Sequence, residues 1–170
     1  LEQVPIIDQR STTVGLSWKR NYKNGNGFMN TVVSTNRLEN IFARYEDNTT
    51  KTGTIFQNDS FEWETKLRFQ ATQFTENWKW STGFNVQNSS YQNNTRFVYY
   101  DIAYKTDLNF TKYGLFFKAS RSFLNDRLDF SWGIRTDADS FSTTSNLLNN
   151  ISPRASISYD LTKSQKWKFN

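Results

Sequence analysis

The stretch FEWETKLRFQATQF at residues 61–74 alternates between apolar and polar side chains. Its odd positions from Phe61 to Ala71 carry mostly rings and aliphatic groups, while its even positions from Glu62 to Thr72 carry charges, amides and hydroxyls. A strand places successive side chains on opposite faces, so this period of two predicts a long strand with one apolar face. Soluble strands average about 5–6 residues, whereas roughly 9–11 residues cross a bilayer as a tilted strand. The length therefore favours a strand that crosses a membrane.

The same alternation recurs along most of the chain. It resumes directly after a break at 75–77, which predicts a hairpin, and further stretches lie near residues 13–19, 78–87, 112–123, 128–135 and 153–160. A last piece at 167–169 reads as the start of another strand. We therefore predict an all-β fold of antiparallel up-and-down transmembrane β-barrel strands, about seven with a stub.

The connections between these stretches differ in length. Those near 22–27, 75–77, 124–127 and 162–166 are short, whereas those near 46–60, 88–108 and 139–150 are long and rich in Asn, Ser, Thr and Asp. Short turns at one end and long loops at the other are typical of an outer-membrane barrel. We accordingly expect long polar loops in these three places.

Composition narrows the chemistry that the chain can perform. Hydrophobic residues are 36% and aromatic residues 17% of the 170 positions, and the chain contains neither Cys nor His. Cys/His zinc sites, cysteine nucleophiles and Ser-His-Asp triads are therefore excluded. The net charge of +5 is compatible with nucleic acid, anionic lipid or an acidic ligand, and does not choose among them.

The carboxylates do not suggest catalysis or a metal site. Glu62 and Glu64 share one strand face, so they point the same way instead of flanking a substrate from opposite sides. Asp137 and Asp139 have the spacing of calcium loops but lack the acidic neighbours that such a site needs. We expect no enzyme, no cofactor and no metal.

The tryptophans gather near the short turns. Aromatic rings with a polar edge prefer the headgroup level of a membrane and form girdles at the rims of barrels. Aromatics of a soluble core would instead favour the middle of strands. Five of the six tryptophans are expected to form such a membrane girdle: Trp18, Trp78, Trp80, Trp132 and Trp167.

Charged side chains collect on the face opposite the rings. A Lys or Arg on a lipid face costs roughly 2–4 kcal/mol at the middle of the bilayer, so this segregation is informative. On a barrel these side chains would line a wet lumen, whereas on a soluble sheet they would only be solvated. The candidates for the lumen are Glu62, Glu64, Lys66, Arg68, Lys79, Lys112, Lys118, Arg135 and Arg154.

Several stretches resemble the barrel of TonB-dependent outer-membrane receptors of the Bacteroidetes type. LLNNISPR at 147–154 is the most specific of them, and GFMNTVVSTNRLEN at 27–40 is the longest. Further pieces lie at 44–48, 113–116, 125–128, 133–137 and 156–159. The resemblance implies a segment of a transmembrane β-barrel domain over residues 1–170, from the middle of the family's barrel, with the plug domain absent from this chain.

The resemblance also implies a function and a location. Such receptors lie in the outer membrane of Gram-negative cells, contact its lipid, and import a scarce ligand such as an iron chelate, a vitamin or an oligosaccharide. Their partners are the plug domain and, through the plug, TonB, both outside this chain. Aromatic faces in the extracellular loops stack on sugars or planar chelates. Here the loop candidates for ligand capture are Tyr45, Tyr91, Tyr99, Tyr100 and Phe141.

Two other interpretations of the residues remain open. A complete small outer-membrane barrel with a structural or adhesion role would show the same alternation. A soluble basic β module that stacks single-stranded nucleic acid on its aromatic side chains would show the same composition. The barrel interpretation itself involves no nucleic acid.

Overall fold

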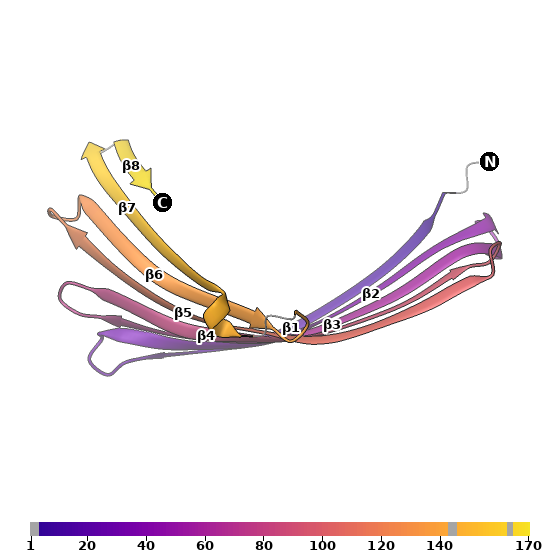
Figure 1. The fold of residues 1–170 in the computed structure, drawn as a ribbon, viewed down its shortest axis with the longest axis horizontal. Helices are drawn as coiled ribbons and strands as arrows, with labels where there is room; N and C mark the ends of the chain where they lie inside the picture. Colours follow the sequence, from indigo (N-terminus) through magenta and orange to yellow (C-terminus); the bar gives the residue numbers. More distant parts are fainter. Residues whose placement is uncertain (1–3, 143–145, 163–164) are drawn as a thin grey trace. The chain divides into compact units, whose positions relative to one another are not determined.

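The computed structural model describes residues 4–142, 146–162 and 165–170. Its strands form one sheet in which each strand pairs with the next in sequence, as in an up-and-down meander (Figure 1). They are β1 (Ile6–Asn21), β2 (Gly27–Asp47), β3 (Thr52–Phe74), β4 (Lys79–Phe97), β5 (Ile102–Phe123), β6 (Leu128–Asp139), β7 (Ile151–Thr162) and β8 (Gln165–Phe169). The predicted fold class is confirmed, including the short last strand. No helix in the described residues has the length and apolarity needed to cross a membrane.

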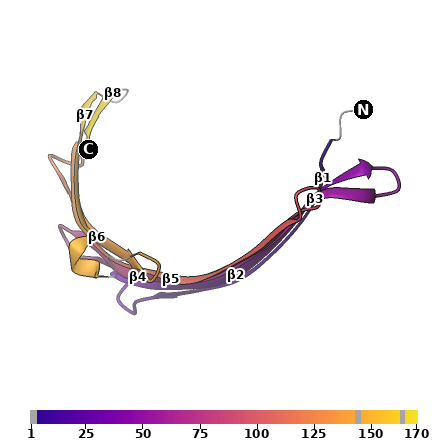
Figure 2. The ribbon, with the colours of Figure 1, turned by 45° about the vertical axis from the view of Figure 1, so that its right-hand side comes forward.

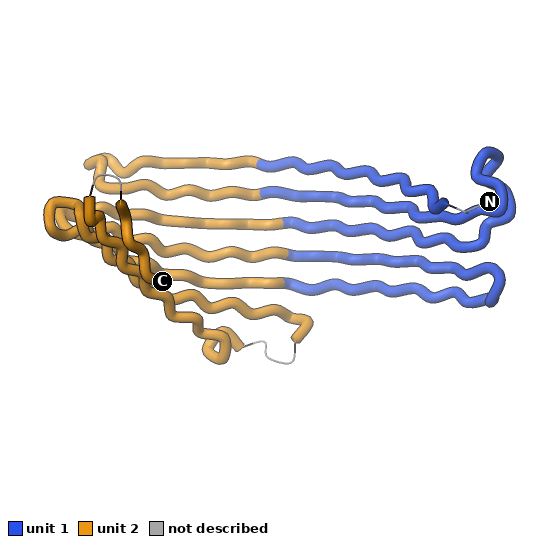
Figure 3. Tube along the Cα trace, turned by 90° about the horizontal axis from the view of Figure 1, so that it is seen from above, with its two compact units in different colours: residues 1–15, 34–65, 88–111 blue, residues 16–33, 66–87, 112–170 orange. Residues whose placement is uncertain are grey.

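The strands contribute to two compact units (Figure 3). Unit 1 comprises residues 1–15, 34–65 and 88–111, and unit 2 comprises residues 16–33, 66–87 and 112–170. β1 to β5 each pass through both units, whereas β6, β7 and β8 belong to unit 2 alone. Each unit is described separately below.

In unit 2 the aromatic side chains of neighbouring strands meet on one face. The ring centres of Trp78 and Trp80 are 5.3 Å apart, those of Trp80 and Phe117 are 5.7 Å apart, and those of Phe117 and Trp132 are 5.5 Å apart. The Trp80–Phe117 and Phe117–Trp132 contacts are cross-strand pairs, each of which stabilises a sheet by a few tenths of a kcal/mol to about 1 kcal/mol, whereas Trp78 and Trp80 are two residues apart in sequence. Trp132 nevertheless remains 40% exposed, so this face ends in a layer of rings without a second layer over it.

The described residues contain almost no conventional core. The buried hydrophobic side chains are three alanines, Ala43, Ala119 and Ala138. A soluble domain of this length buries large aliphatic and aromatic side chains instead. The apolar content of this chain therefore lies on a sheet face, where another medium or another part of the protein must cover it.

In unit 1 the strands continue where long loops were predicted. β3 begins at Thr52 and β4 ends at Phe97, so most of 46–60 and 88–108 is strand, and the connections are the turns at 48–51 and 98–101. The prediction of long loops in these two places is therefore wrong. β2 to β5 are 21, 23, 19 and 22 residues long, about twice the roughly 9–11 residues that cross a bilayer.

Hydrogen bonds between polar side chains explain why these polar segments are strands. Asn58 donates from Nδ2 to Asn93 Oδ1 and to Thr95 Oγ1, both at 2.6 Å. The hydroxyls of Thr35 and Thr65 are 3.2 Å apart. The backbone ladder needs no apolar face, and these cross-strand bonds satisfy the amides and hydroxyls that would otherwise compete for it.

The remaining long connection, at 140–150, contains the one-turn 3-10 helix η1 (Leu147–Asn149), which precedes β7 (Figure 2). The side chain of Asn146 caps it by accepting the N–H of Leu148 at 3.0 Å. The hydroxyl of Thr136 in β6 donates to the carbonyl of Leu147. These contacts attach η1 to the strand that it follows.

Candidate functional site

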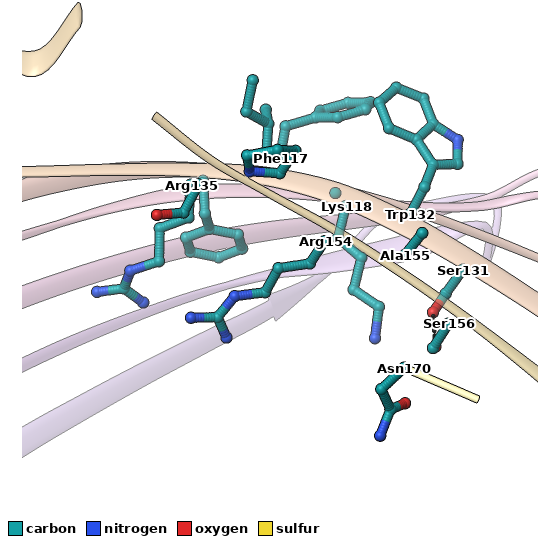
Figure 4. A pocket seen from close by; sticks show the side chains of 14 residues that line it. Phe117, Lys118, Ser131, Trp132, Arg135, Arg154, Ala155, Ser156 and Asn170 are labelled. Atoms are coloured by element: carbon teal, nitrogen blue, oxygen red, sulfur yellow. Dashed lines mark hydrogen bonds between the residues drawn. The ribbon is translucent and has the colours of Figure 1, made fainter. Parts of the chain in front are cut away.

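The two faces of unit 2 separate rings from cations. Phe117 and Trp132 lie on one side of the strands, and Lys118, Arg135 and Arg154 lie on the other (Figure 4). Adjacent residues of a strand point to opposite faces, so Phe117 and Lys118 are separated by alternation alone. The three cations are among the predicted lumen residues, and the structure brings them together.

A glycine creates the space between these cations. Lys118 pairs with Gly133, and Gly133 pairs with Arg154, so the middle position of this row has no side chain. An open cleft of about 680 Å³ includes these residues in its lining. Within the described residues Lys118 and Arg154 make no ion pair, whereas Arg135 donates from Nε to Asp137 Oδ2 at 2.6 Å.

The other lumen candidates are spread over β3, β4 and β5. Lys79 Nζ lies 5.5 Å from the ring centre of Phe74, and Lys112 pairs in register with Asp139. On β3, Lys66 and Arg68 belong to unit 2, and the carboxylates Glu62 and Glu64 belong to unit 1. Their assignment to a lumen stays a prediction.

Two further glycines on the polar face of unit 2 are covered by side chains from neighbouring strands. A Cβ at Gly83 would lie 2.7 Å from Cε1 of Phe116. A Cβ at Gly114 would lie 3.1 Å from Asn85 Oδ1 and in closer contact with Asp137 Oδ1. The absence of Cβ lets these side chains lie flat on the sheet, which keeps this face shallow.

All five candidate girdle tryptophans lie in unit 2, toward the ends of its strands. Trp78 directly precedes β4 and Trp80 lies in its second position, and their rings stack at 26°. Trp18 and Trp167 are 52% and 57% exposed. Their membrane contact stays a prediction.

The ligand-capture candidates do not all lie in loops. Tyr45 lies in β2 and Tyr91 lies in β4, so the prediction that these two belong to loops is wrong. Tyr99 and Tyr100 lie in the turn at 98–101 and are 69% and 76% exposed. Phe141 follows β6 and is 69% exposed. The turn and the segment after β6 therefore present three of the five rings to solvent.

A carboxylate orients Tyr99 in this turn. Its hydroxyl donates to Glu46 Oε1 at 2.7 Å, and this hydrogen bond raises the pKa of Tyr99 above its ordinary value. The bond joins the two turns at the end of unit 1, since Glu46 lies one residue before the end of β2. Tyr100 makes no such bond within the described residues.

The sequence reasoning missed an aromatic cluster in unit 1. The ring centres of Phe42 and Phe56 are 5.6 Å apart, and those of Phe56 and Phe97 are 4.6 Å apart. Phe56 occupies an even position of β3, whereas Trp63 and Phe69 occupy odd positions. The aromatic residues of this stretch thus change from even to odd positions, and this change could have indicated that the strand extends to Phe56. The surrounding Asn and Thr residues instead favoured a loop.

Residues 3–170 match the sequence model of a protein family described as TonB dependent receptor-like, beta-barrel. Among solved structures, one described as the copper transporter OprC is similar with a TM-score of 0.66 at 14% identity, covering 93% of this chain and 29% of that one. BauA, the ferric preacinetobactin receptor from Acinetobacter baumannii, is similar with a TM-score of 0.57 at 10% identity, covering 92% and 29%. The chain thus spans about 29% of the length of either protein. No curated protein matches.

Proposed function

Because the chain belongs to the TonB-dependent receptor-like β-barrel family, we propose that it forms part of the wall of an outer-membrane transporter. The observation that carries this proposal is the separation of rings from cations in unit 2. Trp80, Phe117 and Trp132 form the surface toward lipid, and Lys118 and Arg154 form the surface toward a wet lumen. A lipid-facing wall needs this separation, because lipid cannot solvate the cations.

The wall belongs to a barrel with more strands than this chain describes. In the described residues the strand order is linear, and β1 and β8 each pair with one other strand. An unpaired edge cannot face the hydrocarbon, because its N–H and C=O groups would lack partners. Further strands of the same protein therefore pair with β1 and β8, which favours the larger barrel over a closed small one.

The transported ligand is a scarce compound such as an iron chelate, a vitamin or an oligosaccharide. The two similar structures are described as a copper transporter and a ferric preacinetobactin receptor, which supports import as the shared role. A plug domain fills the lumen and connects the barrel to TonB. The motifs at 27–40 and 147–154 support placement in the Bacteroidetes type of the family, in the outer membrane of a Gram-negative cell. No residue is assigned a catalytic role.

Unit 1 supplies the ligand-facing end. Its strand segments present exposed polar side chains such as Asp107 and Asn109 of β5. The exposed rings of Tyr99 and Tyr100 are its capture candidates, since aromatic faces stack on sugars and planar chelates, and the exposed ring of Phe141 is a separate candidate in unit 2. Tyr45 and Tyr91 take part from strands instead of loops.

The test fractionates cells that express the tagged full-length protein, and measures growth and uptake in a strain from which its gene has been deleted. We expect the tagged protein in the outer-membrane fraction, and loss of growth on one member of a panel of iron chelates, vitamins and oligosaccharides. Deleting TonB should abolish the same uptake. Recovery of the protein in the soluble fraction, with salt-sensitive binding of single-stranded DNA, would instead establish the nucleic-acid module.

A double variant, Tyr99→Ala with Tyr100→Ala, tests capture separately from insertion. We expect an increase in the ligand concentration that gives half-maximal uptake, with unchanged surface abundance. Asn109→Ala serves as the matched control, because it changes an exposed polar side chain of the adjoining strand β5. Equal uptake curves for the double variant and the control would contradict the capture role of the turn.

A further inference from the structure

A cation interrupts the ring-bearing face of unit 2. Arg121 lies in β5 at the same parity as Phe117 and Phe123, so its side chain shares their face. The guanidinium carbon lies 4.7 Å from the ring centre of Phe123 and 5.8 Å from that of Trp78. Two aromatic rings therefore hold the guanidinium on this face by cation–π contact.

The charge of Arg121 is not neutralised within the described residues. Its one hydrogen bond runs from Nη2 to the side-chain oxygen of Asn77 at 3.4 Å, and no carboxylate lies within ion-pair distance. Nε is buried and has no hydrogen-bond partner. An Arg on an apolar face is costly unless an anion or water meets it, and the hydrogen bond to Asn77 uses one of the five N–H donors of this guanidinium, so its Nη groups keep donors for an acceptor.

The sheet around Arg121 is complete. β5 has β4 on one side and β6 on the other, and Asn77 belongs to the turn between β3 and β4. Strands elsewhere in the protein therefore add no neighbour beside β5. The open side of the guanidinium faces whatever covers the apolar face of unit 2.

Arg121 lies three residues before the turn at 124–127, where the ring-bearing face ends. In the proposed barrel this is the headgroup level of one leaflet, because short turns follow directly on the apolar belt. A headgroup phosphate is the anion found at that depth. Guanidinium and phosphate match in charge and in geometry, since two parallel N–H groups can bind two phosphate oxygens.

We propose that Arg121, with Trp78, Phe123 and Asn77, forms a binding site for the phosphate of an anionic phospholipid in the leaflet at the turn end of unit 2. Arg121 donates to the phosphate oxygens, and Asn77 and the two rings fix the plane of the guanidinium. The site depends on the proposed function in one respect, because the ring-bearing face of unit 2 must face lipid. It adds a specific lipid contact to a wall that otherwise needs only apolar surface.

The experiment measures phosphatidylglycerol binding to the purified full-length protein in detergent by native mass spectrometry. Arg121→Gln removes the charge and the paired donors, and we expect at least about tenfold weaker binding, as for loss of a charge-assisted hydrogen bond. Arg121→Lys keeps the positive charge but removes the two parallel N–H donors, and it should give an intermediate affinity. Lys118→Gln, three residues earlier on the opposite face, is the matched control and should bind like the wild type.

Two further arms distinguish the source of the phosphate. Diacylglycerol, which lacks the phosphate, should not occupy the site, and inorganic phosphate at the same concentration should not displace phosphatidylglycerol. Displacement by inorganic phosphate alone would overturn the lipid assignment in favour of a soluble anion. Equal binding by the wild type and Arg121→Gln, or an equal loss in Lys118→Gln, would overturn the role of Arg121.

A folding control keeps the result interpretable. Heat-modifiable migration of each variant on a gel shows whether a folded barrel has formed. If Arg121→Gln does not fold, Trp78→Leu keeps the guanidinium and removes one ring, and we expect it to weaken phosphatidylglycerol binding relative to Lys118→Gln. Failure of the wild type to enter the outer membrane would contradict the proposed function, whereas normal insertion with unchanged lipid binding in the variants would contradict this site alone.

Discussion

Unit 1 and unit 2 share the strands β1 to β5 but place opposite chemistry at equivalent positions of a shared strand. On β5 the odd positions carry Leu115 and Phe117 in unit 2, and Asp107 and Asn109 in unit 1. The backbone ladder continues through both segments. The side-chain pattern therefore does not decide whether a strand forms, and we expect it to follow the medium that each segment meets.

The two units also differ in what joins neighbouring strands. In unit 2 the contacts are ring to ring, as between Trp80 and Phe117. In unit 1 many contacts join amides and hydroxyls, as between Asn58 and Thr95, and Phe42, Phe56 and Phe97 form a separate aromatic cluster. The proposed wall places the first kind of face against lipid and the second in water, because lipid offers polar groups no hydrogen-bond partners and water does.

The largest expected effect on stability comes from placing a lysine at an odd-numbered position of β5, once in unit 2 and once in unit 1. Phe117→Lys should destabilise the folded barrel by about 2–4 kcal/mol, the cost of a cation in the lipid-facing belt. Asn109→Lys should change the free energy of unfolding by no more than about 0.5 kcal/mol, as for an exposed site. Urea unfolding in lipid vesicles, followed by tryptophan fluorescence, measures both. Equal losses would remove the distinction between the units.

A smaller effect is expected from Gly83→Ala on the polar face of unit 2. The added Cβ would lie 2.7 Å from the ring of Phe116 and in closer contact with the carbonyl of Phe69, which belongs to the backbone. Overpacking of this kind costs about 1–3 kcal/mol. Ser120→Ala on the same face of β5 is the control, with a change within about 0.5 kcal/mol. The same unfolding assay compares them, and a neutral Gly83→Ala would show that the face is looser than described.

Phe56→Ala probes unit 1 and should act locally. The substitution removes two ring contacts, each worth about 0.5–1.5 kcal/mol beyond burial. We expect roughly tenfold faster amide hydrogen exchange at the ends of β3 and β4 in unit 1, with unchanged exchange in unit 2. Tyr100→Ala, at a 76% exposed position, is the control. Faster exchange throughout both units would show that they do not open separately.

The smallest expected effect is a pH dependence of the turn after β2. Asp47 accepts the hydroxyl of Thr50 and the N–H of Thr49, both at 2.8 Å, and these bonds lower the pKa of its carboxyl below the ordinary value. A lowered folded-state pKa means that the turn is stabilised above the unfolded value of about 3.9 and loses this contribution as the pH falls through the folded value.

Amide shifts in protein labelled at threonine nitrogen measure this titration. The N–H shifts of Thr49 and Thr50 should change with an inflection below about 3.9, and Asp47→Asn should abolish the inflection. An inflection at or above that value would show that the hydrogen bonds do not persist in solution.

Local alternation was enough to predict the parts of the fold in unit 2. The hairpin around 75–77, the turn at 124–127 and the short β8 all follow from period-two stretches separated by polar breaks. The separation of Phe117 from Lys118 follows in the same way, because alternation is a property of one strand. The meeting of Lys118 with Arg154 across Gly133 needed the register of three strands.

The polar strands of unit 1 could not be predicted from local pattern. Asn, Ser and Thr clusters are typical of loops, and their partners in the sheet are distant in sequence. Asn58 and Thr95 are 37 positions apart in the sequence. Local sequence places Asn58 in a loop, and only the hydrogen bond to Thr95 in the structure shows that it belongs to a strand. Tyr45 and Tyr91 were placed in loops for the same reason. Asn77 and Trp78 likewise meet Arg121 only after β4 and β5 pair.

The most direct measurement is a scan of single cysteines along β5, which introduces each cysteine into a stretch of 170 residues that contains no Cys. Spin labels at Asp107, Asn109, Leu115 and Phe117 in the membrane-inserted full-length protein report collisions with oxygen and with a water-soluble nickel chelate. The account predicts high oxygen and low nickel accessibility at 115 and 117, and the reverse at 107 and 109. The same accessibility ratio at all four positions would contradict the division into a lipid-facing and a water-facing segment.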